Sequence, residues 1–288
     1  MAFEPPQRLV RALGEDDEWL TRLPGTVQEA VDRRKLHVER AVAPGGRSSL
    51  VLLVRQPDGT PAALKLVPPS AAPGLERAAL EQWNGWGAVQ LLDTATDDGL
   101  LLERLHPEVS LRSLPEAKAL LEAAGTVRRL WVEPPAGHGF ETVAERTGRQ
   151  AEAMRNSDEP LVAAALAVRD ELVALAPEEL LLHGNFRQGK VLSGDRAPWL
   201  VVGPEPLVGE RAYDLARLVR DRVEDLVASA AGASAARRRV NKLADSLDVD
   251  RERLRAWTLF RAVESGTRAV AAGRRAEGEL ALEFAGWL

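Results

Sequence analysis

The first third of the chain alternates short apolar runs with charged stretches and turn signals. Apolar residues recur at three- and four-residue spacing from Asp16 to Arg34, which predicts one amphipathic helix, with a break near Pro24 left open. Residues 74–83 have the same helical period. Short apolar runs predict five strands, at residues 37–43, 50–56, 61–67, 88–94 and 99–105. The pattern therefore predicts an antiparallel five-stranded sheet with one inserted helix.

Turn signals separate the strands of this predicted sheet. Asp58-Gly59 lies between the second and third runs and is a strong hairpin signal, because glycine adopts the positive φ that tight hairpin turns need. A second turn is predicted at residues 97–99 (Asp-Asp-Gly). Gly45-Gly46, between the first two runs, fits either a plain hairpin turn or a loop whose backbone N–H groups cover phosphates.

After residue 106 the pattern becomes mostly helical. Helical periodicity covers residues 115–131, 161–176, 213–229 and 250–270. Three short apolar runs, at residues 180–184, 190–194 and 198–203, predict strands in the middle of this half. A loop-rich cluster among helices is where function is expected. The chain is thus predicted to be α+β, with a β-rich part over residues 1–105 and a helical part over residues 106–288.

Composition excludes several classes of protein. The 288 residues include 38 basic and 43 acidic side chains, and no long basic run follows a phosphate backbone, so a nucleic-acid partner is not expected. The absence of cysteine rules out disulfides and thiolate zinc sites. The sequence has neither an N-terminal signal-peptide pattern nor the roughly 18 consecutive apolar residues of a membrane helix. We therefore expect a cytoplasmic protein with no membrane partner.

Two segments of the second half carry a known sequence pattern. Residues 181–192 read LLHGNFRQGKVL, and residues 197–222 read APWLVVGPEPLVGERAYDLARLVRDR. They resemble the aminoglycoside and hydroxyurea phosphotransferase family, which includes streptomycin 6-phosphotransferases. Residues 58–66, 87–93, 100–105 and 250–257 follow the family pattern in the same order. The resemblance implies a protein-kinase-like two-lobed fold, with a small antiparallel β-rich N-lobe and a larger, mostly helical C-lobe.

Three positions of the segment that resembles the catalytic loop, residues 183–205, depart from the family pattern. In the family, an Asp after His-Gly accepts or orients the proton of the substrate hydroxyl, and an Asn and a second Asp hold Mg²⁺ against the nucleotide phosphates. By resemblance these positions are Asn185, Lys190 and Gly203. A neutral amide is not a base, an ammonium repels a cation, and glycine has no side-chain oxygen. The substitutions predict a loss of efficient phosphoryl transfer and argue against Mg²⁺ as a cofactor.

Other residues of this segment offer partial replacements or support. Glu205 is the one nearby carboxylate expected to be able to take up a metal, whereas Asp195 is expected to serve its turn. Lys190 has two interpretations: an ammonium that neutralises nucleotide phosphates in place of Mg²⁺, or an exposed lysine in a decayed loop. His183 has two interpretations: a catalytic base in place of the lost Asp or, by resemblance, a residue that supports the loop. By resemblance, Asp214 braces the loop.

The β-rich part retains the family pattern for nucleotide binding. Lys65 stands at the position of the strand lysine that contacts nucleotide phosphates, with Glu76 as its expected ion-pair partner and Glu81 as the alternative. Residues Glu103 to Leu105 resemble the hinge, where backbone groups pair with adenine. The resemblance thus implies ATP as the nucleotide.

The sequence leaves several ligands and activities open. An aminoglycoside is a polycation and needs acidic side chains in the helical part, where Glu264 and Glu277 are the candidates. The leading hypothesis is a pseudokinase that binds a nucleotide, an aminoglycoside-like natural product or a protein partner without efficient phosphoryl transfer. The alternatives are an active aminoglycoside or hydroxyurea kinase with unusual metal ligation at Glu205, and the same fold with a different transfer reaction.

Overall fold

The computed structural model describes residues 4–93 and 99–288, which form two compact units. The first unit comprises the residues up to Ser110 together with Leu192–Val202. The second unit comprises Leu111–Val191 and Gly203–Leu288. The segment 192–202, which the sequence prediction placed in the helical part, belongs to the first unit because its strands pair there.

The first unit is built on an antiparallel sheet with the order β1-β2-β3-β4 among the described residues. Its strands are β1 (His37–Ala41), β2 (Leu50–Arg55), β3 (Pro61–Leu66) and β4 (Gly99–Glu103). The predicted hairpin between β2 and β3 is confirmed: Gly59 has a φ of +85°, and the Asp58 carboxylate accepts a hydrogen bond from the backbone N–H of Thr60. Residues 97 and 98 of the second predicted turn lie outside the described residues.

The run at residues 88–94 does not form the predicted fifth strand in its described part. Ala88 and Leu91 make only isolated bridges, to Val201 and Leu102. Ala88 and Val89 are nevertheless buried. The backbone of the run also makes hydrogen bonds without a regular ladder: the N–H of Val89 donates to the carbonyl of Val201, and the N–H of Leu92 donates to the carbonyl of Leu101. The strand β5 (Leu105–Ser110) does not join the four-stranded sheet either. It pairs with β7 (Val191–Gly194), which pairs with β8 (Leu200–Val201) in a separate three-stranded sheet.

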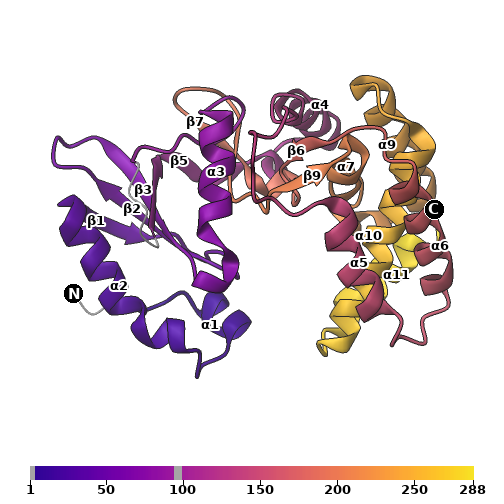
Figure 1. Ribbon diagram of the computed structural model, residues 1–288, viewed down its shortest axis with the longest axis horizontal. Helices are drawn as coiled ribbons and strands as arrows, with labels where there is room; N and C mark the ends of the chain where they lie inside the picture. The colour runs from indigo at the N-terminus through magenta and orange to yellow at the C-terminus, as the bar shows by residue number, and fades with distance from the viewer. Residues whose placement is uncertain (1–3, 94–98) are drawn as a thin grey trace. The chain divides into compact units, whose positions relative to one another are not determined.

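Helices accompany the four-stranded sheet (Figure 1). Helix α1 (Gln7–Leu13), which the sequence analysis missed, and helix α2 (Glu18–Arg34) share one hydrophobic core with the sheet. Pro24 lies inside α2 without ending it, so the break left open near this residue is absent. Asp17 caps the N-terminus of α2, and burial of Leu23 and Val27 against the sheet holds the helix around the proline.

The alternation of side chains along β3 sets the direction of Lys65. Leu64 and Leu66 belong to the core shared with α1 and α2, and successive side chains of a strand point to opposite faces. Lys65 therefore points to the other face, toward helix α3 (Pro73–Trp83), which follows β3 after the short helix η1 (Pro69–Ala71). The helix predicted at residues 74–83 is confirmed by α3.

The second unit is mostly helical and is centred on α10 (Arg251–Ala271), which packs against helices on several sides (Figure 1). Asp250 caps α10 and its bounds agree with the predicted helix. The other helices are α4 (Glu116–Val127), α5 (Val143–Met154), α6 (Leu161–Ala174), α7 (Arg211–Val219), α8 (Val223–Val227), α9 (Gly232–Leu247) and α11 (Arg275–Ala285). Short helices η2 (Leu111–Ser113) and η3 (Gln188–Lys190) complete the helical segments of the described residues.

The helix predicted over residues 213–229 is divided into α7 and α8. Helix α7 ends at Val219, and Arg222, the residue before α8, has a left-handed φ of +56°. Its guanidinium donates hydrogen bonds to the backbone carbonyls of Leu111 and Leu114, more than 100 residues away in sequence. These distant contacts hold the break, and the local helical period does not contain them.

A two-stranded antiparallel sheet, β6 (Leu180–Leu182) and β9 (Leu207–Gly209), lies within the helical unit. The strand β6 was predicted, whereas β9 was not. In the part of the chain that the structure describes, no helix is long and apolar enough to cross a membrane.

Candidate functional site

The pair β6 and β9 brings the two ends of the substituted segment together. The strands pair in register from Leu180 with Gly209 to Leu182 with Leu207. The backbone N–H of Glu205 then donates to the carbonyl of His183 at 2.9 Å, which extends the pairing beyond the strands. Between His183 and Asn185, Gly184 has a φ of +76°, and a Cβ there would lie 2.0 Å from the Glu205 carbonyl oxygen. Only glycine therefore fits this close approach.

All three substituted positions meet around Glu205. The Asn185 side-chain amide donates to Glu205 Oε1 at 2.5 Å. The Lys190 Nζ donates to the carbonyl of Gly203 at 2.5 Å and lies 3.7 Å from Glu205 Oε1. The Lys190 side chain is only 17% exposed, so the interpretation of it as an exposed lysine is wrong. The substituted positions thus form one connected polar network.

The electrostatics of this network favour an ionised Glu205. Burial by itself raises the pKa of Glu205, but the positive charge of Lys190 and the hydrogen bond from Asn185 outweigh it and lower the pKa from 4.5 to about 2. The carboxylate is therefore negative at neutral pH. It faces a neutral amide and an ammonium, so the network is neutral as a whole.

The backbone of residues 183–185 is held in place by buried and half-buried side chains. The Asp214 carboxylate, on α7, accepts hydrogen bonds from the backbone N–H groups of His183 and Gly184 at 3.0 and 2.9 Å. Burial raises the pKa of Asp214. The His183 ring is fully buried, and its Nδ1 accepts from the backbone N–H of Asn185 at 3.2 Å. Arg261 of α10 donates to the carbonyl of Gly184 at 2.9 Å. These contacts agree with the expected supporting positions of His183 and Asp214.

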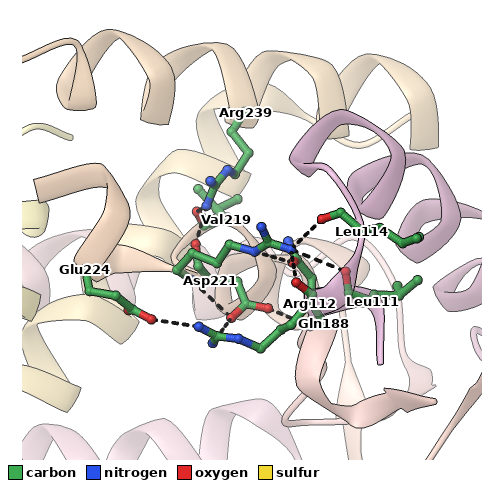
Figure 2. Close-up of polar contacts among 9 residues, drawn as sticks. Leu111, Arg112, Leu114, Gln188, Val219, Asp221, Glu224 and Arg239 are labelled. Carbon is green, nitrogen blue, oxygen red and sulfur yellow. Dashed lines mark hydrogen bonds and ion pairs between the residues drawn. The ribbon is translucent and has the colours of Figure 1, made fainter. Parts of the chain in front are cut away.

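A second set of contacts, centred on the buried Asp221 and Gln188, holds the loop at Gln188 (Figure 2). The Asp221 carboxylate accepts from the backbone N–H of Gln188 at 2.6 Å, and Arg112 lies 3.7 Å from the same carboxylate. Arg112 also donates to Glu224 at 2.8 Å. The Gln188 side-chain oxygen accepts from Arg222 at 2.8 Å. The backbone of the loop is therefore anchored at Gly184 and again at Gln188.

The expected pair of Lys65 and Glu76 is present in the first unit. Lys65 Nζ lies 2.6 and 2.5 Å from the two carboxylate oxygens of Glu76, and the two side chains are 11% and 7% exposed. Glu81, the alternative partner, has no role in this ion pair. A part-buried ammonium and carboxylate held this closely form a rigid cationic group on β3. Its contact with nucleotide phosphates stays a prediction.

The hinge candidates lie at the junction of β4 and β5. The backbone N–H of Glu103 donates to the carbonyl of Gln90, and its carboxylate accepts from Arg196 at 2.6 Å. Leu105 is buried and pairs with Gly194 in the three-stranded sheet. The role of this segment in adenine binding stays a prediction. In the same unit Asp195 contacts His106 at 2.9 Å, directly after β7.

The two substrate candidates differ in exposure, and each contacts an arginine. Glu264 is 12% exposed and accepts from Arg268, one helical turn further along α10, at 2.7 Å. Glu277, on α11, is half-exposed and accepts from Arg274 at 3.1 Å. Each carboxylate already pairs with an arginine three or four residues away in the sequence, so neither is free of a cationic partner. A role of either residue in binding an aminoglycoside stays a prediction. Glu264 lines a cavity in this unit, whereas Glu277 does not.

The residues present do not fit a magnesium ion at this loop. Among residues 4–93 and 99–288, no group of three or more His, Cys, Asp or Glu side chains is arranged to hold a metal. Glu205 is the one acidic side chain within the substituted network, and Asn185 and Lys190 already contact it. An ammonium 3.7 Å from the carboxylate opposes the approach of a cation. We therefore derive no metal-dependent step for this site.

The sequence analysis missed a group of arginines in the second unit. Arg217 of α7 and Arg220, the residue directly after this helix, are three residues apart, and Arg261 of α10 donates to the carbonyl of Gly184 in the loop. The spacing of two arginines in an otherwise apolar stretch was the available signal. A solvent-exposed helical face gives the same spacing, so only the burial of the side chains in the structure distinguishes a buried group of arginines from an exposed one.

Solved structures identify the class of protein that this fold defines. The crystal structure of aminoglycoside phosphotransferase APH(4)-Ia is similar with a TM-score of 0.61 and 16% identity, over 92% of this chain and 97% of that one. Choline kinase LicA from Streptococcus pneumoniae is similar with a TM-score of 0.62 and 10% identity, over 93% and 100%. At these identities the likeness shows the fold alone, which is the kinase-like α+β fold of small-molecule kinases, as predicted.

Sequence relatives identify the family. The family described as aminoglycoside/hydroxyurea antibiotic resistance kinase matches residues 34–273. Streptomycin 6-kinase of Streptomyces glaucescens is 35% identical over 270 residues, 88% of this chain and 86% of that protein. Hydroxyurea phosphotransferase of Kitasatospora aureofaciens is 38% identical over 262 residues, 86% and 73%. The protein belongs to the aminoglycoside/hydroxyurea antibiotic resistance kinase family, and the resemblance seen in the sequence is confirmed.

Proposed function

We propose that the protein is a pseudokinase of this family, which binds a nucleotide and a small molecule without efficient phosphoryl transfer. One observation carries the proposal. Asn185 and Lys190, at the positions of the base and of a metal ligand, both contact Glu205, and Lys190 also donates to the carbonyl of Gly203 at the second metal position. The polar groups at the substituted positions thus find their hydrogen-bond and ion-pair partners within the same network.

The chemistry of these side chains supports the loss of transfer. The Asn185 amide donates a hydrogen bond to Glu205 and cannot accept the proton of an attacking hydroxyl at neutral pH. Loss of a general base typically reduces the rate by roughly 10²–10⁴. The Lys190 ammonium contributes a positive charge where the family holds Mg²⁺, but it cannot coordinate two phosphate oxygens and a carboxylate as a metal does.

Nucleotide binding is the second part of the proposal. The close pair of Lys65 and Glu76 supports it, because this pair positions the strand lysine for phosphates in kinases. A thermostable mutant of APH(4)-Ia, similar in fold with a TM-score of 0.60, was solved in a ternary complex with ADP and hygromycin B. We extend the nucleotide and the small-molecule class to this chain as a proposal. A cytoplasmic location goes with it, because ATP is held inside the cell.

Binding and turnover of ATP test the two parts separately. We expect ATP binding by calorimetry to weaken at least tenfold in Lys65→Ala, and to be retained in the matched control Lys242→Ala, which removes an exposed lysine of α9. With ATP, Mg²⁺ or Mn²⁺ and a panel of aminoglycosides, mass spectrometry should detect no phosphorylated product above a protein-free blank. Product that disappears in Lys65→Ala would refute the pseudokinase.

An active antibiotic kinase is the second candidate function. Its support is the identity of 35% and 38% to relatives named as a kinase and a phosphotransferase, together with a carboxylate at Glu205 that stays ionised. Under this candidate Glu205 performs the work of the missing carboxylates, so Glu205→Gln abolishes product formation. Product formation in the wild type that persists in Glu205→Gln would contradict this specific route.

A further inference from the structure

The second unit contains a cavity with a volume of about 750 Å³. Its lining comes from helix α5, from the segment 156–160 that follows this helix, and from helices α10 and α11 (Figure 1). Helix α10 packs against both α5 and α11, so the cavity is built on one group of packed helices. Its volume is in the range of pockets that bind small molecules in other proteins.

Gln150, on α5, brings an unsatisfied hydrogen-bond acceptor to this cavity. Its side-chain oxygen Oε1 is buried and has no hydrogen-bond partner within residues 4–93 and 99–288. The hydroxyl of Thr267, another lining residue, already donates to the carbonyl of Val263 at 3.0 Å. A buried carbonyl oxygen without a donor costs free energy, and most such atoms in folded proteins have a partner. A ligand with an O–H or N–H group in this cavity would supply the missing donor.

The charged side chains of the lining are balanced in number and largely paired. Three arginines and three carboxylates line the cavity: Arg146, Arg149, Arg268, Asp158, Glu159 and Glu264. Arg146 and Arg149 both pair with Glu141, Arg146 at a distance of 2.6 Å, and Arg268 pairs with Glu264 at 2.7 Å. A polycationic ligand would bring several ammonium groups close to three guanidinium groups, and like charges repel. The lining therefore favours a ligand with no net charge.

Neutral polar side chains and apolar side chains complete the lining. Asn156 and Ser157, in the segment after α5, add an amide and a hydroxyl group to the amide of Gln150. Val270 of α10, which is 44% exposed, and Leu282 of α11 add apolar surface. Amides and hydroxyls both donate and accept hydrogen bonds, as the hydroxyl groups of a ligand do, and the C–H groups of a saturated ring pack on apolar side chains. This combination suits a ring that carries several hydroxyl groups.

We propose that this cavity binds an uncharged polyhydroxylated ring, a sugar or a cyclitol, and that Gln150 is its specificity-determining residue. A ring hydroxyl donates a hydrogen bond to Gln150 Oε1, and the ring packs on Val270 and Leu282. The inference rests on the small-molecule part of the proposed function and names its ligand class. It does not involve the nucleotide, because the whole lining belongs to the second unit.

Binding of myo-inositol and D-glucose, two uncharged polyhydroxylated rings, tests the ligand class, with the polycation streptomycin as the comparison. Calorimetry and thermal unfolding are run at low and at high salt. We expect the uncharged rings to bind and to raise the melting temperature, with affinities that change less than about twofold with salt, because salt screens interactions between charges. Binding of neither uncharged ring, or a preference for streptomycin that disappears as the salt concentration rises, would overturn the assignment.

Replacement of Gln150 by methionine assigns the binding to its side-chain oxygen. Gln150→Met keeps a side chain of similar length without the acceptor, so it should weaken binding of the uncharged rings about tenfold. The melting temperature of the unliganded variant should not fall, because a buried polar atom without a partner is removed. A lower melting temperature with unchanged ring affinity would show a purely structural role and refute the proposal. Gln28→Met, at an exposed glutamine of α2, is the matched control and should change the affinity less than about twofold.

Gln150→Glu tests whether this position sets specificity. The variant keeps an acceptor oxygen and adds a negative charge, so it should shift the preference from D-glucose toward D-glucosamine, in which an ammonium replaces one hydroxyl. An unchanged preference would contradict contact between this residue and the ligand. ATP binding by the wild type is measured in parallel. Ring binding without ATP binding would count against the proposed nucleotide binding alone, whereas ATP binding without ring binding would count against this inference alone.

Discussion

The ion pair of Lys190 and Glu205 makes a measurable prediction about stability and pH. A fall in the pKa of Glu205 from 4.5 to about 2 is equivalent to about 3 kcal/mol in favour of the ionised carboxylate. The side chain of Glu205 is 52% exposed, however, and solvent screens such a pair, so we expect about 1 kcal/mol. Lys190→Met removes the largest cause of the lowered pKa. The variant should therefore lose about 1 kcal/mol of unfolding free energy at pH 7 through this pair.

The pH dependence separates this pair from other effects of the substitution. Because the pKa of Glu205 is lower in the folded protein than in the unfolded chain, the stabilisation is present above pH 4.5 and is lost as the pH falls toward 2. The lost hydrogen bond to the Gly203 carbonyl has no such dependence. The difference between wild type and Lys190→Met should thus shrink by about 1 kcal/mol as the pH falls from 6 toward 2.

Urea unfolding followed by tryptophan fluorescence measures this difference at each pH at which the protein is folded. The control is Glu205→Gln, in the wild type and in Lys190→Met, which forms a double-mutant cycle. In the Glu205→Gln background there is no titrating carboxylate at this position, so the effect of Lys190→Met on the unfolding free energy should no longer depend on pH. A wild-type advantage over Lys190→Met that is the same at every pH would refute the account of the network.

Three further predictions concern the loop and the arginines. Gly184→Ala should lower the unfolding free energy by well over 1 kcal/mol, because the added Cβ would lie 2.0 Å from a carbonyl oxygen. The control Gly273→Ala has a similar positive φ of +73° but open surroundings, so it should lower the unfolding free energy by about 1 kcal/mol. Equal losses of the two variants in urea unfolding would contradict this reasoning. Arg220→Met should raise the unfolding free energy of the unliganded protein by about 1–4 kcal/mol, because it removes a buried charge without a partner, and a decrease would count against that reasoning. The triple variant N185D, K190N and G203D should gain Mg²⁺-dependent ATP binding by calorimetry, since aspartate tolerates the φ of +62° found at position 203; no gain would mean that the site has lost more than these residues.

Local pattern was sufficient where a structural element depends on its own residues. Asp58-Gly59 between two apolar runs predicted the β2–β3 hairpin, and the helical period with Asp250 before it predicted α10. Motif positions in the loop could be compared with the family pattern by residue identity, which is why the substitutions at Asn185 and Lys190 could be predicted without a structure. The pairing of Lys65 with Glu76 followed from the same motif order.

Prediction failed where distant residues decide the outcome. In the described part of the run, residues 88–93, Ala88 and Val89 are buried, and isolated bridges to Val201 and Leu102 stand in place of a regular strand. The helical period through residues 213–229 gives no sign of a break. The break depends on distant residues, because the carbonyls of Leu111 and Leu114 accept hydrogen bonds from Arg222, which has a left-handed φ. The periodicity of apolar residues indicates which face of a segment is apolar. It does not indicate which residues from distant parts of the chain will contact that segment.

The sequence by itself determined the family and the kinase-like fold, because these depend on residue identity at ordered positions. It also predicts the loss of the usual base and metal ligands, and this stays a prediction. Only the tertiary structure decided which contacts the residues at those positions make. The antiparallel pair β6 and β9 brings Glu205 against Asn185 and Lys190, and the packing of α7 near α10 leaves Arg220 buried without a partner. Burial and charge balance arise from contacts between residues far apart in the chain, which a local pattern of polar and apolar positions does not encode.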